Sequence, residues 1–126
     1  MIEIIKFRET DTEFQDISRV FNLVSHDFIS HPDIEKENWD LRDLSVNTDR
    51  LLLYHHNTMI GFLRYCQGRD ENKRKCFFNI FIDPKYNDKG YRQLLYNRML
   101  DEVKNINPNA YYMEIYDHPN YKCSKN

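Results

Sequence analysis

The chain has 126 residues, 40% of them hydrophobic, and its 18 basic and 20 acidic residues give a formal net charge of −2. That length predicts one domain spanning residues 1–126, and the near-neutral balance argues against nucleic acid or a membrane surface as partner, since either would need a clustered basic field. No apolar run approaches a bilayer span, and three widely spaced cysteines favour neither a disulfide framework nor a metal site, so we expect a cytoplasmic protein without metal.

The first half of the chain predicts a strand, two helices and a hairpin. Thr10 followed by Glu13 resembles a capping box, and apolar residues then recur at helical spacing, which predicts a helix with one buried face. Asn57–Thr58 separates two apolar runs and is typical of a hairpin turn. The predicted ranges are 2–8 for the strand, 11–29 for the first helix, a weaker helix from Pro32 onward, and 50–55 and 59–66 for the hairpin strands.

The second half predicts a strand, a turn, a helix and a last strand. Residues 76–82 are apolar on both faces, which places this strand in the centre of the sheet. A turn over 84–90 leads into a helix that ends near residue 105, and 110–116 form the last strand. A strand–helix–strand order implies a crossover, so 76–82 and 110–116 should pair in parallel. We therefore expect an α/β fold, a mixed sheet in the order β-α-α-β-β-β-α-β with helices on both faces.

The most informative segment is the turn between the central strand and the helix that follows it. It places a helix N-terminus, with unpaired backbone N–H groups, at the carboxyl end of a buried strand, and such a position attracts phosphate. A glycine in the turn favours close approach of backbone to ligand, and residues 83–98 hold four basic against two acidic side chains. The backbone amides expected to form the phosphate cradle are those of Asn87, Asp88, Lys89, Gly90, Tyr91 and Arg92.

The same segment resembles the signature of the GCN5-related N-acetyltransferase (GNAT) family, and the resemblance extends over essentially the whole chain. The family pattern has a strand end, a proline, a polar turn and a glycine before a helix. Two positions depart from it, because Asn87 stands where Gln or Arg is usual and Arg92 stands where a small residue is usual. The matching positions are Ile82, Pro84, Tyr86, Asn87, Lys89, Gly90, Arg92, Leu95 and Tyr96.

The resemblance implies an acetyl-coenzyme A-dependent N-acetyltransferase that acts on a small-molecule or peptide amine. Acetyl-coenzyme A (acetyl-CoA) would be the cosubstrate, with its pyrophosphate on the cradle. The backbone of Phe81 and Ile82 would bind the pantetheine arm, where two parallel strands separate and leave N–H and C=O groups unpaired. The amine would attack the thioester directly, helped by positioning and by one proton transfer.

Candidates for that proton transfer follow from position in the family pattern. Many members carry a glutamate general base early in the central strand, and the register from Gly90 places Cys76 there. The remaining candidates, near the carboxyl end of the last strand, are Glu114, Tyr116 and His118. Each also has a structural interpretation: a salt bridge for Glu114, strand packing for Tyr116 and a strand-ending turn for His118.

The chain ends soon after the last predicted strand, so we expect the C-terminal helix and strands usual in the family to be missing. An uncovered strand edge is commonly paired, and a homodimer through that edge is therefore one expectation. A function of a different class stays open, namely a non-catalytic GNAT-like domain that binds CoA or serves dimerisation or interaction. In that case the turn over 84–92 could be a bare strand-to-helix turn.

Overall fold

The computed structural model describes residues 1–68, 75–105 and 111–114, which contain one five-stranded sheet in the order β1-β2-β3-β4-β5. Strands β1 to β4 pair antiparallel, whereas β5 pairs parallel with β4. The predicted element order, the mixed sheet and the parallel pairing are thus confirmed. The elements are β1 (Ile2–Lys6), α1 (Asp11–Val24), α2 (Pro32–Asp40), β2 (Val46–His55), β3 (Thr58–Gly68), β4 (Lys75–Ile82), the 3-10 helix η1 (Pro84–Lys89), α3 (Tyr91–Lys104) and β5 (Tyr111–Glu114).

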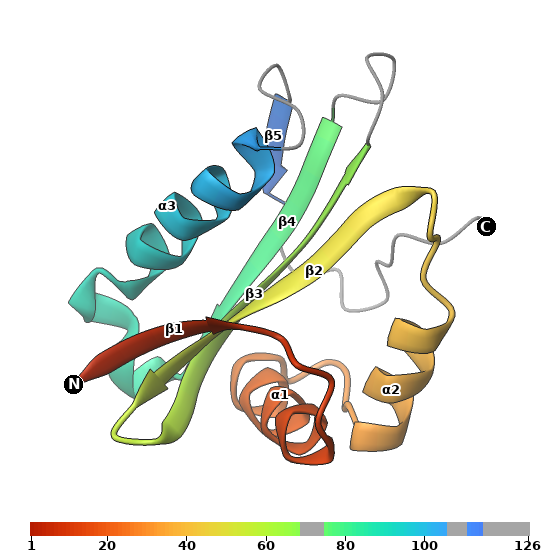
Figure 1. The fold of residues 1–126 in the computed structure, drawn as a ribbon. Coiled ribbons are helices and arrows are strands. Elements are labelled where there is room, and N and C mark those ends of the chain that lie inside the picture. Colours follow the sequence, from red (N-terminus) through yellow and green to blue (C-terminus); the bar gives the residue numbers. More distant parts are fainter. Residues whose placement is uncertain (69–74, 106–110, 115–126) are drawn as a thin grey trace.

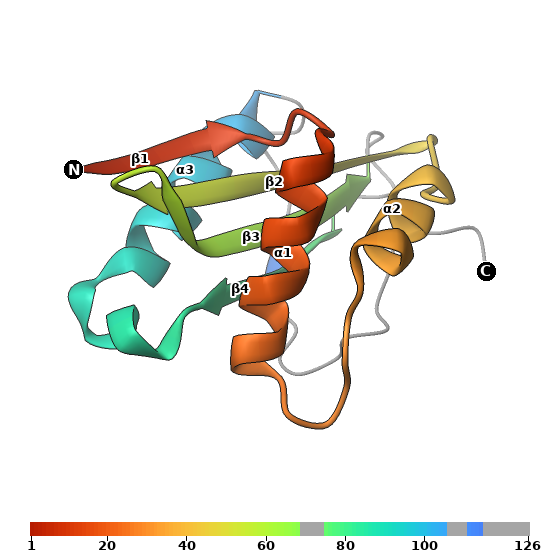
Figure 2. The same cartoon turned by 90° about the horizontal axis from the view of Figure 1, so that it is seen from below.

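Helices cover both faces of the sheet, as expected (Figure 1). Helix α1 lies across the strands on one face with α2 beside it, and α3 lies on the opposite face (Figure 2). Each face therefore has its own core. On the α3 face, Leu95, Met99 and Val103 are fully buried against the sheet. On the α1 face, Ile17 of α1 is buried in a cluster that includes Phe62 of β3.

Local capping fixes where α1 begins. The Glu13 amide donates to Thr10 Oγ1 at 3.2 Å, and Glu13 Oε1 accepts from the Thr10 amide at 3.5 Å, which forms the predicted capping box. Glu13 is buried, and its Oε2 also accepts from Arg8 Nε at 2.7 Å. The carboxylate therefore holds the chain that enters the helix as well as the first turn itself.

We expect Thr10→Ala to lower the free energy of unfolding by about 1 kcal/mol, because it removes the acceptor of an otherwise unpaired first-turn amide. Thr12, which is exposed on the same helix, offers a matched control, and Thr12→Ala should change stability little. Urea denaturation of the two variants measures the difference. An equal loss in both would contradict the capping role.

Helix α1 ends at Val24, earlier than the predicted end at residue 29. The apolar spacing continues to Phe28 in the sequence, but the Ser25 backbone is already extended (φ −96°, ψ 127°). The reason is a tertiary contact, since Asn22 Nδ2 donates to the Ser30 carbonyl at 2.9 Å and the Ser30 amide donates to Asn22 Oδ1 at 2.7 Å. This reciprocal pair holds Ser30 beside the last turn of α1, so the intervening chain must turn back.

Strands β2 and β3 are longer than predicted and are joined by a tight turn at His56–Asn57. The φ angles there are 50° and 66°, the left-handed conformation that a two-residue type I′ hairpin requires at both positions. The turn begins one residue earlier than the predicted Asn57–Thr58. In β2, just before the turn, the pairing register shifts between Leu53 and Tyr54. The hairpin itself is confirmed.

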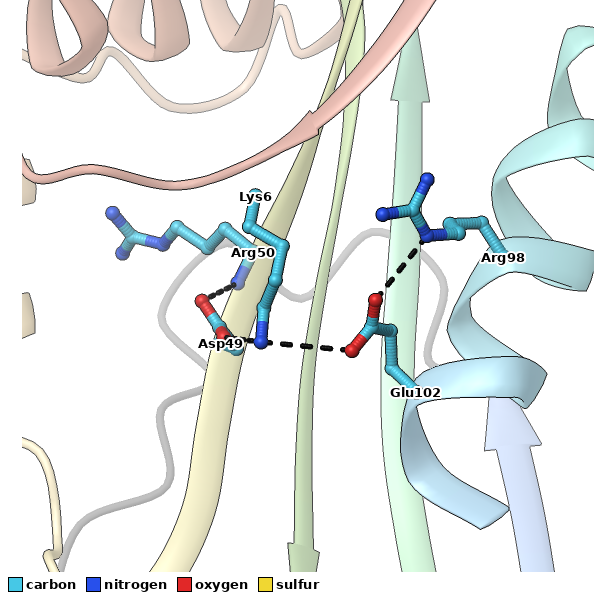
Figure 3. A network of polar contacts seen from close by, with 5 residues as sticks. All are labelled: Lys6, Asp49, Arg50, Arg98 and Glu102. Atoms are coloured by element: carbon cyan, nitrogen blue, oxygen red, sulfur yellow. Dashed lines mark hydrogen bonds and ion pairs between the residues drawn. The ribbon is translucent and has the colours of Figure 1, made fainter. Parts of the chain in front are cut away.

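A polar network links α3 to the first two strands (Figure 3). Lys6 Nζ on β1 lies 3.4 Å from Asp49 Oδ2 on β2 and 3.5 Å from Glu102 Oε2 on α3. Glu102 Oε1 also accepts from Arg98 Nε at 3.2 Å. Because the Lys6 side chain is 50% exposed, each ion pair is expected to contribute less than about 1 kcal/mol. The network therefore orients α3, while burial of its apolar face supplies most of its stability.

Three observations on the described ranges bear on membranes, metals and disulfides. No helix there is long and apolar enough to cross a membrane, and no group of three or more His, Cys, Asp or Glu side chains is placed to hold a metal ion. Cys76 is a free, buried thiol, whereas Cys66 is disulfide-bonded. The sequence predicted no disulfide framework, and the bond at Cys66 was not foreseen.

Candidate functional site

The candidate site lies at the carboxyl end of β4, beyond its last described pair with β5. In the described residues, pairing between β4 and β5 stops at Phe78 and Glu114, while pairing between β3 and β4 continues to Ile82. The Asp83 amide then donates to the Ile60 carbonyl of β3 at 2.8 Å. The last residues of β4 thus pair with β3 beyond the described part of the β5 ladder.

Alternation along β4 decides which backbone groups face away from β3. Asp83 donates toward β3, so Phe81, two residues earlier, also directs its backbone groups toward β3. In agreement, the Phe81 carbonyl oxygen lies only 2.9 Å from the position that a Cβ on Gly61 would take. The groups of Ile80 and Ile82 consequently point away from β3. The register favours Ile80 and Ile82 over Phe81 as backbone partners of a ligand.

The turn after β4 is held by its own backbone and by Asp83. Asp83 Oδ1 accepts from the Lys85 amide at 3.1 Å, and the Asp83 carbonyl accepts from the Tyr86 amide at 2.8 Å. Pro84 opens η1, where its missing N–H costs no hydrogen bond. Tyr86 packs against Tyr91 with ring centroids 6.2 Å apart. These contacts set the path of the chain between strand and helix.

Gly90 forms the junction between η1 and α3. Its φ is 78°, a left-handed conformation in which glycine is favoured, and a Cβ added there would meet no atom within 4 Å. The first hydrogen bond of α3 runs from the Leu94 amide to the Gly90 carbonyl at 3.3 Å. The amides of Tyr91, Arg92 and Gln93 precede it and so have no acceptor within the helix. The junction therefore presents N–H donors beside open space, which fits a pyrophosphate.

Arg92 lies between this junction and the end of β4. Its Nη1 donates to the Ile80 carbonyl at 3.3 Å, which confirms that this carbonyl faces away from β3. A cavity of 350 Å³ opens there, lined by Phe78, Ile80, Arg92, Gln93 and Tyr96. The guanidinium occupies a place where a ligand amide could otherwise bind Ile80, and its positive charge suits an anionic ligand.

Some of the charged side chains near the cradle are exposed, and others are engaged in contacts within the protein. Lys85 and Lys89 have exposed side chains, as has Asp88. Asp83 is used in the turn, and Arg98 is paired with Glu102 on α3. The side chains that remain available to an anion at the turn are thus mainly lysines.

The structure places the sequence-predicted catalytic residues only in part. Glu114 ends β5 opposite Phe78, at the point where described pairing stops. Tyr116 and His118 lie outside the described residues. Cys76, at the position of the family's general base, is fully buried on the α3 face, and burial raises the pKa of its thiol to about 12. Cys76 is therefore a packed neutral thiol and supplies no base.

We expect Cys76 to resist alkylation in the folded protein at pH 8, because the raised pKa keeps the thiolate fraction low and the sulfur is inaccessible. Iodoacetamide labelling followed by mass spectrometry should modify Cys76 only after denaturation. The stability that the neutral thiol contributes is complete below the ordinary pKa of 9.0 and is lost as pH rises toward about 12. Rapid native labelling at pH 8 would contradict this placement.

A buried polar cluster on the α1 face was not foreseen from the sequence. Arg50 of β2, Arg64 of β3 and Asn79 of β4 line a cavity of 50 Å³ beside Trp39 of α2. Figure 3 shows the Arg50 side chain directed away from the Lys6–Asp49–Glu102 network. In the sequence, the available signal for this cluster was Arg50, which directly precedes an apolar run in a strand. The register between β2 and β3 decides that its side chain faces inward.

Four antiparallel strands, a parallel fifth strand and helices on both faces define a fold class shared with acetyltransferases. The sequence profile of the acetyltransferase (GNAT) family matches residues 13–122. This match covers most of the chain, and the chain belongs to the GNAT family. No curated protein matches the sequence.

Solved structures support the fold. The ribosomal-protein-S18-alanine N-acetyltransferase from Escherichia coli is 17% identical with a TM-score of 0.60, and the match covers 83% of this chain and 61% of that one. The protein yncA from Salmonella typhimurium, solved with its cofactor acetyl-CoA, is 15% identical with a TM-score of 0.66, and the match covers 83% and 64%. The chain thus spans less than two thirds of either protein, and at these identities the likeness shows the fold alone.

Proposed function

We propose that the chain is an acetyl-CoA-dependent N-acetyltransferase that acts on a small-molecule or peptide amine. The observation that carries the proposal is the junction at Gly90, where helix-start amides, open space and the carboxyl end of β4 adjoin a cavity of 350 Å³. Membership of the GNAT family supports the reaction class. The acetyl-CoA bound to yncA and the alanine substrate of the Escherichia coli enzyme support the cosubstrate and a peptide amine.

The chain's own residues would bind and orient the cosubstrate. Within the predicted 87–92 segment, the amides of Tyr91 and Arg92 at the start of α3 would hold the pyrophosphate, since residues 87–89 lie inside η1. The Ile80 and Ile82 backbone would hold the pantetheine arm. For the Ile80 carbonyl to bind the pantetheine arm, the hydrogen bond from Arg92 to this carbonyl must break. The Arg92 guanidinium could then pair with phosphate instead. Bound acetyl-CoA supplies a thioester, which is the acyl donor to the amine. Holding donor and amine together can remove most of the entropic barrier.

Proton transfer remains assigned by position to Glu114, Tyr116 and His118. Cys76 is excluded as base by its burial and raised pKa. The proposal therefore places any protein base on the β5 side of β4. Replacing each of the three candidates singly and following the pH profile of kcat tests this assignment.

Calorimetric titration with acetyl-CoA tests the cofactor site. We expect saturable binding, and we expect Lys89→Glu to weaken it about tenfold, because a reversed charge beside the cradle opposes the pyrophosphate. Lys36 is exposed on α2, on the other face of the sheet, so Lys36→Glu makes the same change of charge at a distance. The control should bind like the parent. Absence of binding to the parent at millimolar acetyl-CoA would refute the proposal.

A non-catalytic role is the second candidate, and the buried thiol at Cys76 in the usual base position favours it. Such a domain would bind CoA or a protein partner without turnover. An assay of thiol release against a panel of amines separates the two functions. A homodimer through the outer edge of β5 and a cytoplasmic location remain predictions, and sedimentation equilibrium tests the first.

A further inference from the structure

An exposed apolar surface lies on α2 and on the segments that flank it in the chain. Among the described residues, eight large hydrophobic side chains are exposed, and six of them fall within residues 23–44. The most exposed of the six are Ile29 at 74%, Leu44 at 70% and Leu41 at 57%. Exposed apolar side chains that gather in one place are typical of an interaction surface. We call residues 23–44 the α1–α2 surface, and its other exposed apolar members are Leu23, Phe28 and Ile34.

The same part of the chain is strongly acidic. Residues 9–49 hold eleven acidic and three basic side chains, a formal charge of −8, whereas the rest of the chain holds nine and fifteen, a formal charge of +6. On the α1–α2 surface, one exposed lysine, Lys36, stands against four exposed carboxylates, those of Asp27, Asp33, Glu37 and Asp40. No hydrogen bond or ion pair joins these four carboxylates to another of the described residues. Their charge is therefore open to a partner.

The acidic residues of α2 do not all stabilise the helix that carries them. Asp33 and Glu37 are four residues apart and lie next to each other on the helix surface, where like charges repel. Asp40 is the last residue of α2, and no basic residue accompanies it in the last turn, although the helix dipole favours cations there. Glu37 and Asp40 thus cost stability, and local conflicts of this kind are typical of functional sites.

Acidic and apolar side chains form two neighbouring stripes on α2. Residues three, four and seven apart share one side of a helix, so Asp33, Glu37 and Asp40 form the acidic stripe. Ile34 and Leu41 are seven apart and form the apolar stripe, each one position after a member of the acidic one. The buried residues of α2 lie on the other side of the helix, against the core of the α1 face. Both stripes therefore face outward.

Charge complementarity decides which occupant fits these stripes. A second copy of the chain, placed with its α1–α2 surface against the first, would bring like charges together. A basic segment that also carries apolar side chains would instead pair its cations with the acidic stripe and bury the apolar one. We propose that the α1–α2 surface binds a lysine-rich amphipathic segment of another protein. None of its residues belongs to the junction at Gly90, so this surface is independent of the proposed acetyl-CoA site.

The test uses the full chain and short fluorescent peptides that share one helical spacing. The first peptide combines leucine with lysine, the second has glutamate in place of each lysine, and the third has glutamine in place of each leucine. Fluorescence anisotropy follows binding. We expect the leucine–lysine peptide to saturate in the micromolar range and both others to bind at least about tenfold more weakly. Added salt should weaken the first peptide, because exposed charges are screened.

Glu37→Lys combined with Asp40→Lys should weaken the leucine–lysine peptide at least about tenfold. The matched control is Glu3→Lys combined with Asp101→Lys, which makes the same change of net charge at exposed carboxylates of β1 and α3. The control should bind the peptide like the parent. The α2 variant should melt at a temperature no lower than the parent, because it removes a repulsion and places a cation at the end of α2. Unfolding would then not explain its loss of binding.

Ile34→Gln tests the apolar stripe and should weaken the leucine–lysine peptide at least about threefold. Leu94→Gln is its matched control, since the two side chains are 44% and 45% exposed and Leu94 lies on α3. Equal binding of the three peptides, or an equal loss in a variant and its control, would overturn the basic partner. Self-association of the parent in sedimentation, abolished by Ile34→Gln, would also overturn it, because a second copy would then occupy the surface.

Discussion

Replacing Glu35 with alanine is expected to lower the free energy of unfolding by about 3–5 kcal/mol. Glu35 is 4% exposed, and its Oε1 faces Arg50 Nη2 across 3.6 Å. Its Oε2 accepts from Ser30 Oγ at 2.6 Å. Without Glu35, the buried guanidinium of Arg50 keeps its desolvation cost but loses its ion pair with this carboxylate. Urea denaturation measures the loss.

Two further variants separate charge from packing. Glu35→Gln keeps the side-chain volume and an acceptor for Ser30, so its loss should be smaller than that of Glu35→Ala but still clear. Combining Glu35→Leu with Arg50→Met should recover much of the stability, because no unpaired charge remains in the core. A loss below about 1 kcal/mol for Glu35→Ala would show instead that Arg50 is well solvated.

The second large effect is expected at Gly61, on β3 beside the end of β4. A Cβ at this position would lie 2.7 Å from Ile82 Cδ1 and 2.9 Å from the Phe81 carbonyl oxygen. The Ile82 side chain can move, but the carbonyl belongs to the sheet, so Gly61→Ala should cost about 1–3 kcal/mol. The displaced end of β4 carries the proposed pantetheine contacts. Affinity for acetyl-CoA should therefore fall with stability.

Gly90 provides the matched comparison, since a Cβ there meets nothing and the obstacle is the backbone conformation alone. Asparagine tolerates left-handed φ better than alanine does, so Gly90→Asn should be more stable than Gly90→Ala. At Gly61 the order should invert, so that Gly61→Ala is more stable than Gly61→Asn, because the larger side chain collides more with Ile82 and the Phe81 carbonyl. Thermal denaturation of the four variants measures both orders. The same order at both positions would contradict the steric explanation for Gly61.

Much of the architecture could be predicted because its signals are local. The Thr10–Glu13 capping box, the alternation and apolarity of the strands, and the proline and glycine around η1 each act over a few residues. The strand–helix–strand order then left parallel pairing of β4 and β5 as the natural connection. The same local pattern identified Gly90 as the residue that joins turn and helix, with the φ of 78° that its type suits.

The remaining features depended on contacts that periodicity and turn residues do not encode. Helix α1 ends at Val24 because Asn22 forms hydrogen bonds with Ser30. The spacing of apolar residues does not predict this pair. Which β4 carbonyls point away from β3 follows from the register with β3, and a shift of one residue would exchange Ile80 for Phe81. The Arg50–Arg64–Asn79 cavity exists only because three strands align their polar positions on one face.

The sequence by itself determined the fold class and the strand–turn–helix segment that ends at Gly90, because turn chemistry and periodicity are encoded residue by residue. Only the tertiary structure decided what surrounds that segment. It directed the Ile80 carbonyl away from β3, placed Arg92 on that carbonyl and buried Arg50 with an unsatisfied donor. These features arise from sheet register and burial, which are properties of the assembled chain.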